Sequence, residues 1–272
     1  MKTGHAIITG GSSGIGKATA TLLAQQGLNL TLIARDSAKL EQTRRILEQT
    51  LPSQKILTQT ADVAVRSQVE QAIEDAIATQ GPPTHLITCA GIAHCDYFQN
   101  LSLEAYERSM AVNYFGSLYC IRAVLPLMEQ QQQGHIVVVS SGVGLIGIYG
   151  YSAYSPTKFA LRGLAESLRG ELKPLGIQIS VVYPPDTDTP QLAQENKIKP
   201  LEMKQISGTA KMWSAENVAK TIVKGIEKKQ FIIAPGPEMM VLGRLHSLIA
   251  PLLNRYFDRI VTRTRSARHL NG

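Results

Sequence analysis

The 272-residue chain has few cysteines, and their spacing fits neither a metal site nor a disulfide framework. Cys89, Cys95 and Cys120 are odd in number, and no Cys-x-x-Cys pair or His/Cys cluster accompanies them. Disulfides are rare in reducing compartments. We therefore expect three reduced thiols in a cytoplasmic protein, and we expect no metal.

Long apolar runs are also missing. No stretch reaches the roughly 20 uninterrupted apolar residues that span a bilayer. The N-terminus enters a glycine-rich turn too soon to contain the apolar core of a signal peptide. Any contact with a membrane is therefore expected to be peripheral, on its cytoplasmic face.

Acidic residues are scarce near the C-terminus, where residues 241–272 contain Asp258 as the one acid. The same stretch contributes 6 − 1 = +5 of the net charge of +7, through Arg244, Arg255, Arg259, Arg263, Arg265 and Arg268. Apolar residues recur there every three or four positions, at Leu242, Leu245, Ile249, Leu252, Tyr256 and Ile260, with interruptions at Gly243 and Pro251. We predict an amphipathic basic extension over 236–272 that contacts anionic lipid or a dimer partner and takes no part in the chemistry. The aromatic interleaving of a nucleic-acid binder is missing, so we expect no nucleic acid.

The remaining residues, 1–235, alternate between short apolar runs and amphipathic stretches. This pattern is typical of a parallel sheet covered by helices. Strands are expected at 5–9, 29–34, 55–60, 85–89, 134–140, 178–183 and 230–234, and helices at 16–26, 37–51, 66–79, 103–132, 153–175 and 215–228. The predicted fold class is α/β, a doubly wound Rossmann domain with a seven-stranded parallel sheet.

A glycine-rich turn joins the first strand to the first helix. It contains Gly10, Ser12, Ser13, Gly14, Ile15 and Gly16. Glycines let the backbone approach a pyrophosphate, and the free amides of a helix N-terminus favour an anion. We expect a dinucleotide at this turn.

The end of the second strand indicates which dinucleotide is bound. An acid there suits the ribose hydroxyl of NADH, whereas an arginine suits a 2′-phosphate. The strand ends at Arg35, and Lys39 follows one helical turn later. Asp36 leaves an acid beside the arginine. We favour NADPH.

Four polar residues further along the chain describe a hydride-transfer site: Asn113, Ser141, Tyr154 and Lys158. Tyr154 and Lys158 are four residues apart, so on a helix their side chains lie on the same face. An ammonium group favours the ionised form of a nearby phenol and should lower its pKa. Tyr154 is therefore the candidate general acid.

These motifs together resemble the short-chain dehydrogenases/reductases over residues 3–235. The resemblance implies that Tyr154 donates the proton, Ser141 holds the substrate oxygen, Lys158 binds the nicotinamide ribose, and Asn113 supports a water that supplies protons. It further implies that Asp62 and Val63 contact the adenine, and that Ala90 and Gly91 line the cofactor site after Cys89, where the family usually has asparagine. Dimers and tetramers are common in this family, so a homo-oligomer is expected.

The string Tyr183-Pro184-Pro185-Asp186-Thr187-Asp188-Thr189-Pro190 resembles members of the family that reduce a long-chain keto lipid in sphingolipid synthesis. The resemblance places Thr187 and Thr189 at the cofactor and a mobile substrate lid at about 190–213. The expected function is NADPH-dependent reduction of such a ketone. Reduction of a steroid or retinoid ketone, and a non-catalytic NADPH sensor, remain as alternatives.

Overall fold

The computed structural model describes residues 4–208 and 212–270 and contains one large parallel sheet. Seven strands are hydrogen-bonded in the order β3-β2-β1-β4-β5-β6-β9. Their bounds are β1 His5–Thr9, β2 Asn29–Ala34, β3 Ile56–Thr60, β4 His85–Thr88, β5 Gly134–Val139, β6 Ile177–Val182 and β9 Ile232–Ile233. The predicted fold class is confirmed.

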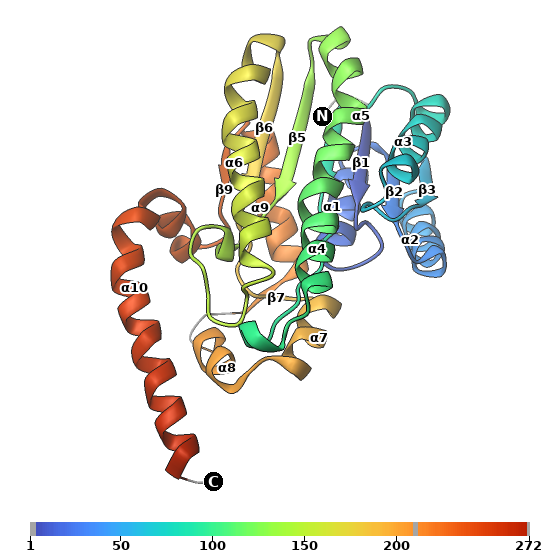
Figure 1. Ribbon diagram of the computed structural model, residues 1–272. Helices are drawn as coiled ribbons and strands as arrows, with labels where there is room; N and C mark the ends of the chain where they lie inside the picture. Colours follow the sequence, from blue (N-terminus) through green and yellow to red (C-terminus); the bar gives the residue numbers. More distant parts are fainter. Residues whose placement is uncertain (1–3, 209–211, 271–272) are drawn as a thin grey trace.

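Helices cover both faces of the sheet (Figure 1). Successive strand residues point to opposite faces, so Ile7 and Ile8 enter two different cores. On the Ile7 side lie α3 (Arg66–Gln80), α5 (Gly116–Gln131) and α6 (Ser155–Leu172), and on the Ile8 side lie α1 (Gly14–Gln25), α2 (Ser37–Thr50) and α9 (Ala215–Glu227). Helix α4 (Leu103–Met110) precedes α5. Burial on both faces explains why the strands read as continuous apolar runs.

The strand order changes direction at β1, which pairs with β2 on one side and β4 on the other. Ligands of open α/β sheets bind outside the carboxyl ends of the strands at such a switch point. Gly10 follows β1 with a φ of +69°, and a Cβ there would lie 2.9 Å from the backbone nitrogen of Ala90, just after β4. Only glycine allows β1 and β4 to end this close together.

Two predicted segments differ in detail from the structure. The helix expected at 103–132 is α4 and α5 joined by a π-helical segment, η2, at Ala111–Phe115. The expected lid folds into α7 (Pro190–Ile198) and α8 (Leu201–Ser207) between the paired strands β7 (Thr187–Asp188) and β8 (Trp213–Ser214); residues 209–211 of that lid lie outside the described residues. Three short 3-10 turns complete the described elements, η1 (Phe98–Asn100), η3 (Gly142–Gly144) and η4 (Lys173–Leu175).

The C-terminal extension is α10 (Pro237–Leu270), which runs along one side of the body and extends past it (Figure 1). It kinks at Leu245, two residues after the predicted interruption at Gly243, while Pro251 lies within the helix. His246 is hydrogen-bonded to Arg162 of α6 at 2.9 Å, and Thr264 is hydrogen-bonded to Gln205 of α8. The side chains of Arg265 and Arg268, which belong to the predicted basic face, lie outside the described residues.

One helical stretch among the described residues is long and apolar enough to cross a membrane. It lies in the continuous segment Leu103–Gln131, in which an 18-residue window has a mean hydropathy of 1.2. Its buried residues, among them Cys120, Ile121 and Val124, belong to the core beside the sheet. A core helix of a folded domain satisfies the same criteria, so this stretch is weak grounds for a membrane span.

Candidate active site

A cavity of about 190 Å³ opens at the carboxyl ends of β1, β4, β5 and β6. The structure gathers most of the predicted site residues in its lining: Gly10, Ser13, Gly14, Ile15, Gly16, Ala90, Gly91, Ser141, Tyr154, Lys158, Thr187 and Thr189. These residues are far apart in sequence and meet because parallel strands end at the same edge of the sheet.

Helix α1 presents its N-terminus to this cavity. Ser13 is the N-cap residue, yet its side chain caps no backbone amide of α1. The first turn of α1 contains no acidic residue. An uncapped helix start with a lining serine hydroxyl is a suitable environment for a phosphate group.

The end of β2 presents Arg35 to solvent, beyond the lining of the cavity. The acid beside it is engaged in starting α2: Asp36 accepts a hydrogen bond from the Lys39 backbone at 3.0 Å and pairs with the Lys39 ammonium at 3.2 Å. Asp36 is therefore occupied, and Lys39 is partly neutralised. Both residues are well exposed, so the pair is worth little for stability.

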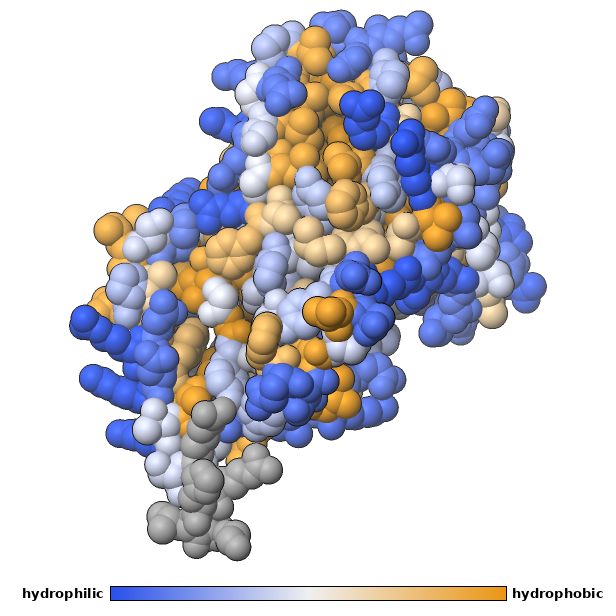
Figure 2. Space-filling view, viewed as in Figure 1, coloured by the Kyte–Doolittle hydropathy of each residue, from blue (hydrophilic) through white to orange (hydrophobic). Residues whose placement is uncertain are grey.

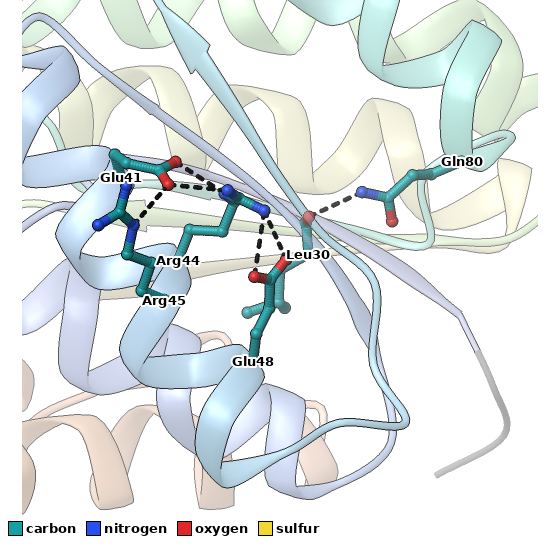
Figure 3. Close-up of polar contacts among 6 residues, drawn as sticks. All are labelled: Leu30, Glu41, Arg44, Arg45, Glu48 and Gln80. Atoms are coloured by element: carbon teal, nitrogen blue, oxygen red, sulfur yellow. Dashed lines mark hydrogen bonds and ion pairs between the residues drawn. The ribbon is translucent and has the colours of Figure 1, made fainter.

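The two arginines further along α2 are also occupied (Figure 3). Arg44 binds Glu41 and Glu48, and Arg45 binds Glu41 at 2.9 Å. These hydrogen bonds, that from Arg44 first, lower the pKa of the Glu41 carboxyl to about 2. Arg35 is left as the cation best suited to a 2′-phosphate at this end of the site.

Four further predicted residues also lie outside the cavity lining. Asp62, which follows β3, forms an ion pair with Arg108. Val63 is buried, and the Ser12 carbonyl accepts a hydrogen bond from Thr43 at 3.3 Å. The charge of Arg35 acts on Asp62, so the ends of β2 and β3 are close together. The fourth residue is Asn113.

Asn113 is fully buried in the π-helical segment η2. Its side chain exchanges two hydrogen bonds with the Ile92 backbone, at 2.8 and 2.9 Å, and donates a third to Thr157 of α6 at 2.9 Å. A π-helical turn rotates the residues it contains relative to the regular helix. Asn113 thus connects the loop after β4 to the helix that carries Lys158.

Tyr154 and Lys158 lie together at the start of α6, as the spacing predicts. The Lys158 nitrogen is 5.5 Å from the centre of the Tyr154 ring and donates to the Val139 carbonyl at 3.0 Å. Pro156 is tolerated between them because it falls in the first turn of the helix. Burial lowers the pKa of Lys158 to about 8.

The prediction that Lys158 lowers the pKa of Tyr154 is wrong for the protein without bound cofactor. Burial raises this pKa above its usual value, and the nearby Glu195 carboxylate raises it further, while a hydrogen bond with Ser141 acts in the opposite direction. Burial dominates because a phenolate loses more hydration than the neutral phenol. The result is a phenol that stays protonated, which is the form a general acid needs.

A buried polar cluster beside Tyr154 was missed by sequence reasoning. Tyr151 donates a hydrogen bond to Glu195 of α7, Gln191 donates to the other carboxylate oxygen at 2.9 Å, and the Lys199 nitrogen lies 3.9 Å away. Tyr151, Gln191 and Glu195 line the cavity, as does Asp186. The sequence gives no signal for this cluster, because no lysine follows Tyr151 by four residues and the isolated acids belong to no motif.

An apolar groove of about 640 Å³ adjoins the cavity. Its walls come from the loop after β5, from α8, and from the inner side of α10, including Leu242, Ile249, Leu253 and Phe257. The two spaces share Ser141, Val143, Tyr151, Pro184, Pro185 and Asp186. Figure 2 shows apolar side chains where α10 adjoins the body. The extension therefore lines the same groove as Ser141, although none of its described residues lines the polar cavity.

Comparison with known proteins shows which family the chain is similar to. Residues 4–199 match the family model described as short chain dehydrogenase. A 3-dehydrosphinganine reductase of Danio rerio is 44% identical over 95% of this chain and 79% of its own length. A 3-ketodihydrosphingosine reductase of Bos taurus is 43% identical over 91% of this chain and 76% of its own length. The solved structure of a short-chain dehydrogenase from Sphingobium yanoikuyae in complex with NADPH superposes with a TM-score of 0.79 at 25% identity, covering 94% of this chain and 96% of that one.

Proposed function

The chain belongs to the short-chain dehydrogenase family, and we propose that it reduces the ketone of 3-ketodihydrosphingosine with NADPH, a step of sphingolipid biosynthesis. The observation that carries the proposal is the position of Ser141, which lies where the polar cavity meets an apolar groove of about 640 Å³. A short polar ketone would leave such a groove unfilled, whereas a long alkyl chain would bury its apolar surface there. Relatives named for this substrate match over most of the chain.

The residues present fit NADPH. The uncapped start of α1 and Ser13 would hold the pyrophosphate, and Arg35 would hold the 2′-phosphate. Lys158 would bind the nicotinamide ribose, and Thr189 would lie near the nicotinamide amide. The bound cofactor supplies the hydride that reduces the carbonyl carbon.

The protein's own part is to hold the ketone oxygen and to deliver a proton to it. The Ser141 hydroxyl and the Tyr154 phenol converge on the cavity, where two donors polarise a carbonyl. Burial keeps the Tyr154 phenol protonated until negative charge develops on that oxygen. Lys158 would then stabilise the phenolate left on Tyr154, and Asn113 holds the start of α6 in place through Thr157.

The alkyl chain would lie in the groove between the body and α10. Leu253 and Phe257 pack against the core beside Ile249, so this wall is continuous with the interior. Each buried methylene contributes about 0.8 kcal/mol of transfer free energy. A long chain therefore supplies binding energy that a short ketone lacks.

The outer side of α10 suits contact with a membrane surface. Leu248 is 74% exposed and Leu252 66% exposed, and Arg244, Arg255 and Arg259 are exposed on the same helix. Apolar side chains flanked by arginines are typical of helices that lie on anionic lipid. We further propose peripheral attachment at the cytoplasmic face through this helix, with homo-oligomerisation as the second role that α10 could serve.

The direct test is NADPH oxidation by the purified protein with 3-ketodihydrosphingosine, beside steroid, retinoid and short-chain ketones. The proposal expects the highest kcat/KM with the sphingoid ketone and formation of dihydrosphingosine in equal amount to the NADPH consumed. If kcat/KM were higher with a steroid or retinoid ketone than with the sphingoid ketone, the proposed substrate class would be wrong. Failure to oxidise NADPH with any ketone would support the sensor alternative.

A further inference from the structure

Asp186 occupies the junction between the two substrate spaces. It is one of the residues that line both the cavity and the groove, together with the polar side chains of Ser141 and Tyr151. A ketone oxygen held by Ser141 with its alkyl chain in the groove places the carbonyl carbon at this junction. The carbon on the other side of the ketone would then lie in the part of the cavity that Asp186 also lines.

The backbone around Asp186 is held in place on both sides. Its carbonyl accepts a hydrogen bond from the Trp213 amide at 2.9 Å, across the β7–β8 pair. The Pro184 carbonyl accepts from Gly142 at 3.0 Å, and the Thr187 hydroxyl donates to the Pro185 carbonyl at 2.8 Å. Two consecutive prolines further restrict the chain. The carboxylate is therefore presented from a rigid segment.

The Asp186 carboxylate has no assigned structural role. Among the described residues it accepts no hydrogen bond and forms no ion pair, unlike Asp36, which caps α2. Burial raises the pKa of Asp186, and the charge of Lys199 lowers it. Asp186 is half-buried and lines both spaces without a donor of its own, so its carboxylate is available to a cationic ligand there.

Among the described residues, Lys199 is the cation whose charge acts on Asp186. Glu195 is already satisfied by Tyr151 and Gln191, with the Lys199 nitrogen 3.9 Å away. Asp186, Glu195 and Lys199 together carry −2 + 1 = −1. Lys158 adds a further +1, which brings these four groups to zero, but its charge acts on Glu195 rather than on Asp186.

We infer that Asp186 binds the ammonium group of an α-amino ketone and thereby determines the preference of this enzyme for amino ketones. The inference rests on the proposed function, because 3-ketodihydrosphingosine carries its amino group on the carbon next to the ketone. Asp186 is a specificity residue in this account. Proton transfer remains with Tyr154.

The test compares two ketones in wild type, Asp186→Asn and Asp188→Asn. One substrate is 3-ketodihydrosphingosine, and the other is the same hydroxy ketone with hydrogen in place of the amino group. Asp188 is a matched control because it is an exposed acid two residues further along the chain, in β7. Asparagine keeps the shape of aspartate and removes its charge.

Asp186→Asn should lower kcat/KM for the amino ketone by roughly 10- to 100-fold, the value of a charge-assisted hydrogen bond. In the same variant, kcat/KM for the amine-free ketone should change by less than about twofold. In Asp188→Asn, kcat/KM for both ketones should change by less than about twofold. An equal loss on both ketones would assign Asp186 a structural role and overturn the inference. So would a wild-type enzyme that does not distinguish the two ketones, a result that does not depend on the variant folding.

The proposed function can fail separately. If wild type reduces neither ketone, the sphingoid substrate class is wrong, and the inference falls with it. If wild type reduces the amino ketone efficiently and the variant shows no selective loss, the function stands and the role of Asp186 is refuted.

Discussion

The cofactor side and the substrate side of Tyr154 differ in the kind of structure that forms them. The cofactor side consists of strand ends, glycines and an uncapped helix start, most of them from the first half of the chain and the start of α6, with Thr187 and Thr189 added from β7 and the residue after it. The substrate side consists of side chains from separate segments, including Tyr151, Asp186, Glu195 and the inner face of α10. The first side uses backbone geometry that many relatives can share. In the proposed function, the second side determines which ketone is reduced.

The largest expected effect lies at the boundary between the two sides. Tyr154→Phe removes the proton donor, so the reduction rate should fall by ~10²–10⁴-fold while NADPH affinity changes little. The measurement is single-turnover NADPH oxidation together with cofactor titration. Tyr151→Phe is the matched control, since its hydroxyl binds Glu195, and it should cost far less. A Tyr154→Phe protein that keeps more than about a tenth of the rate would refute the assignment.

The cofactor side is tested next, at Arg35. Arg35→Ala should raise the KM for NADPH by roughly 10–100-fold, because a charge-assisted contact to the 2′-phosphate contributes about 1.5–3 kcal/mol. The KM for NADH should stay nearly constant. Arg45→Ala serves as a control, since Arg45 is an exposed neighbour already paired with Glu41. Equal changes for both cofactors would show that Arg35 does not select the phosphate.

The substrate side is tested by two adjacent leucines of α10. Leu253 lines the groove, whereas Leu252 is 66% exposed. Leu253→Ala should lower kcat/KM for the long-chain ketone by about tenfold, in line with the 1–3 kcal/mol that small changes of an apolar pocket cost. A short-chain ketone should be unaffected, and Leu252→Ala should leave both unchanged. An equal loss of kcat/KM for long-chain and short-chain ketones would show that α10 does not bind the alkyl chain.

The smallest expected effect concerns the outer face of α10. Arg255→Gln and Arg259→Gln should each weaken binding to anionic liposomes by about 1 kcal/mol, roughly fivefold. Added salt should reduce binding by the wild type and narrow the difference. Sedimentation with vesicles of mixed phosphatidylserine and phosphatidylcholine measures both effects. Salt-insensitive binding, or an unchanged affinity in the variants, would favour an oligomer contact instead, which a sizing column would detect.

The cofactor side could be predicted from the sequence because its signals are local. The turn at Gly10 follows one strand and starts one helix, and Tyr154 and Lys158 are one helical turn apart. The sheet was predictable for the same reason, since buried strands are short apolar runs. The π-helical turn around Asn113 leaves no comparable trace, because its sequence continues a helical pattern.

The substrate side depends on contacts between distant segments. Tyr151 is hydrogen-bonded to Glu195, which is 44 residues away in sequence, and Thr264 of α10 is hydrogen-bonded to Gln205, which is 59 residues away. No local pattern relates such residues. The Tyr154 pKa was misjudged for a related reason: the sequence shows the neighbouring Lys158, whereas burial and Glu195 are visible only after folding.

The central claim, that the ketone is held at Ser141 and Tyr154 with its alkyl chain in the groove, is tested most directly by a chain-length series. The measurement is kcat/KM of the wild-type protein with NADPH and 3-keto sphingoid bases of increasing length, below their aggregation limit. The account predicts a rise of up to about fourfold per added methylene until the groove is filled, because each buried methylene contributes about 0.8 kcal/mol. A kcat/KM that is independent of chain length would contradict it.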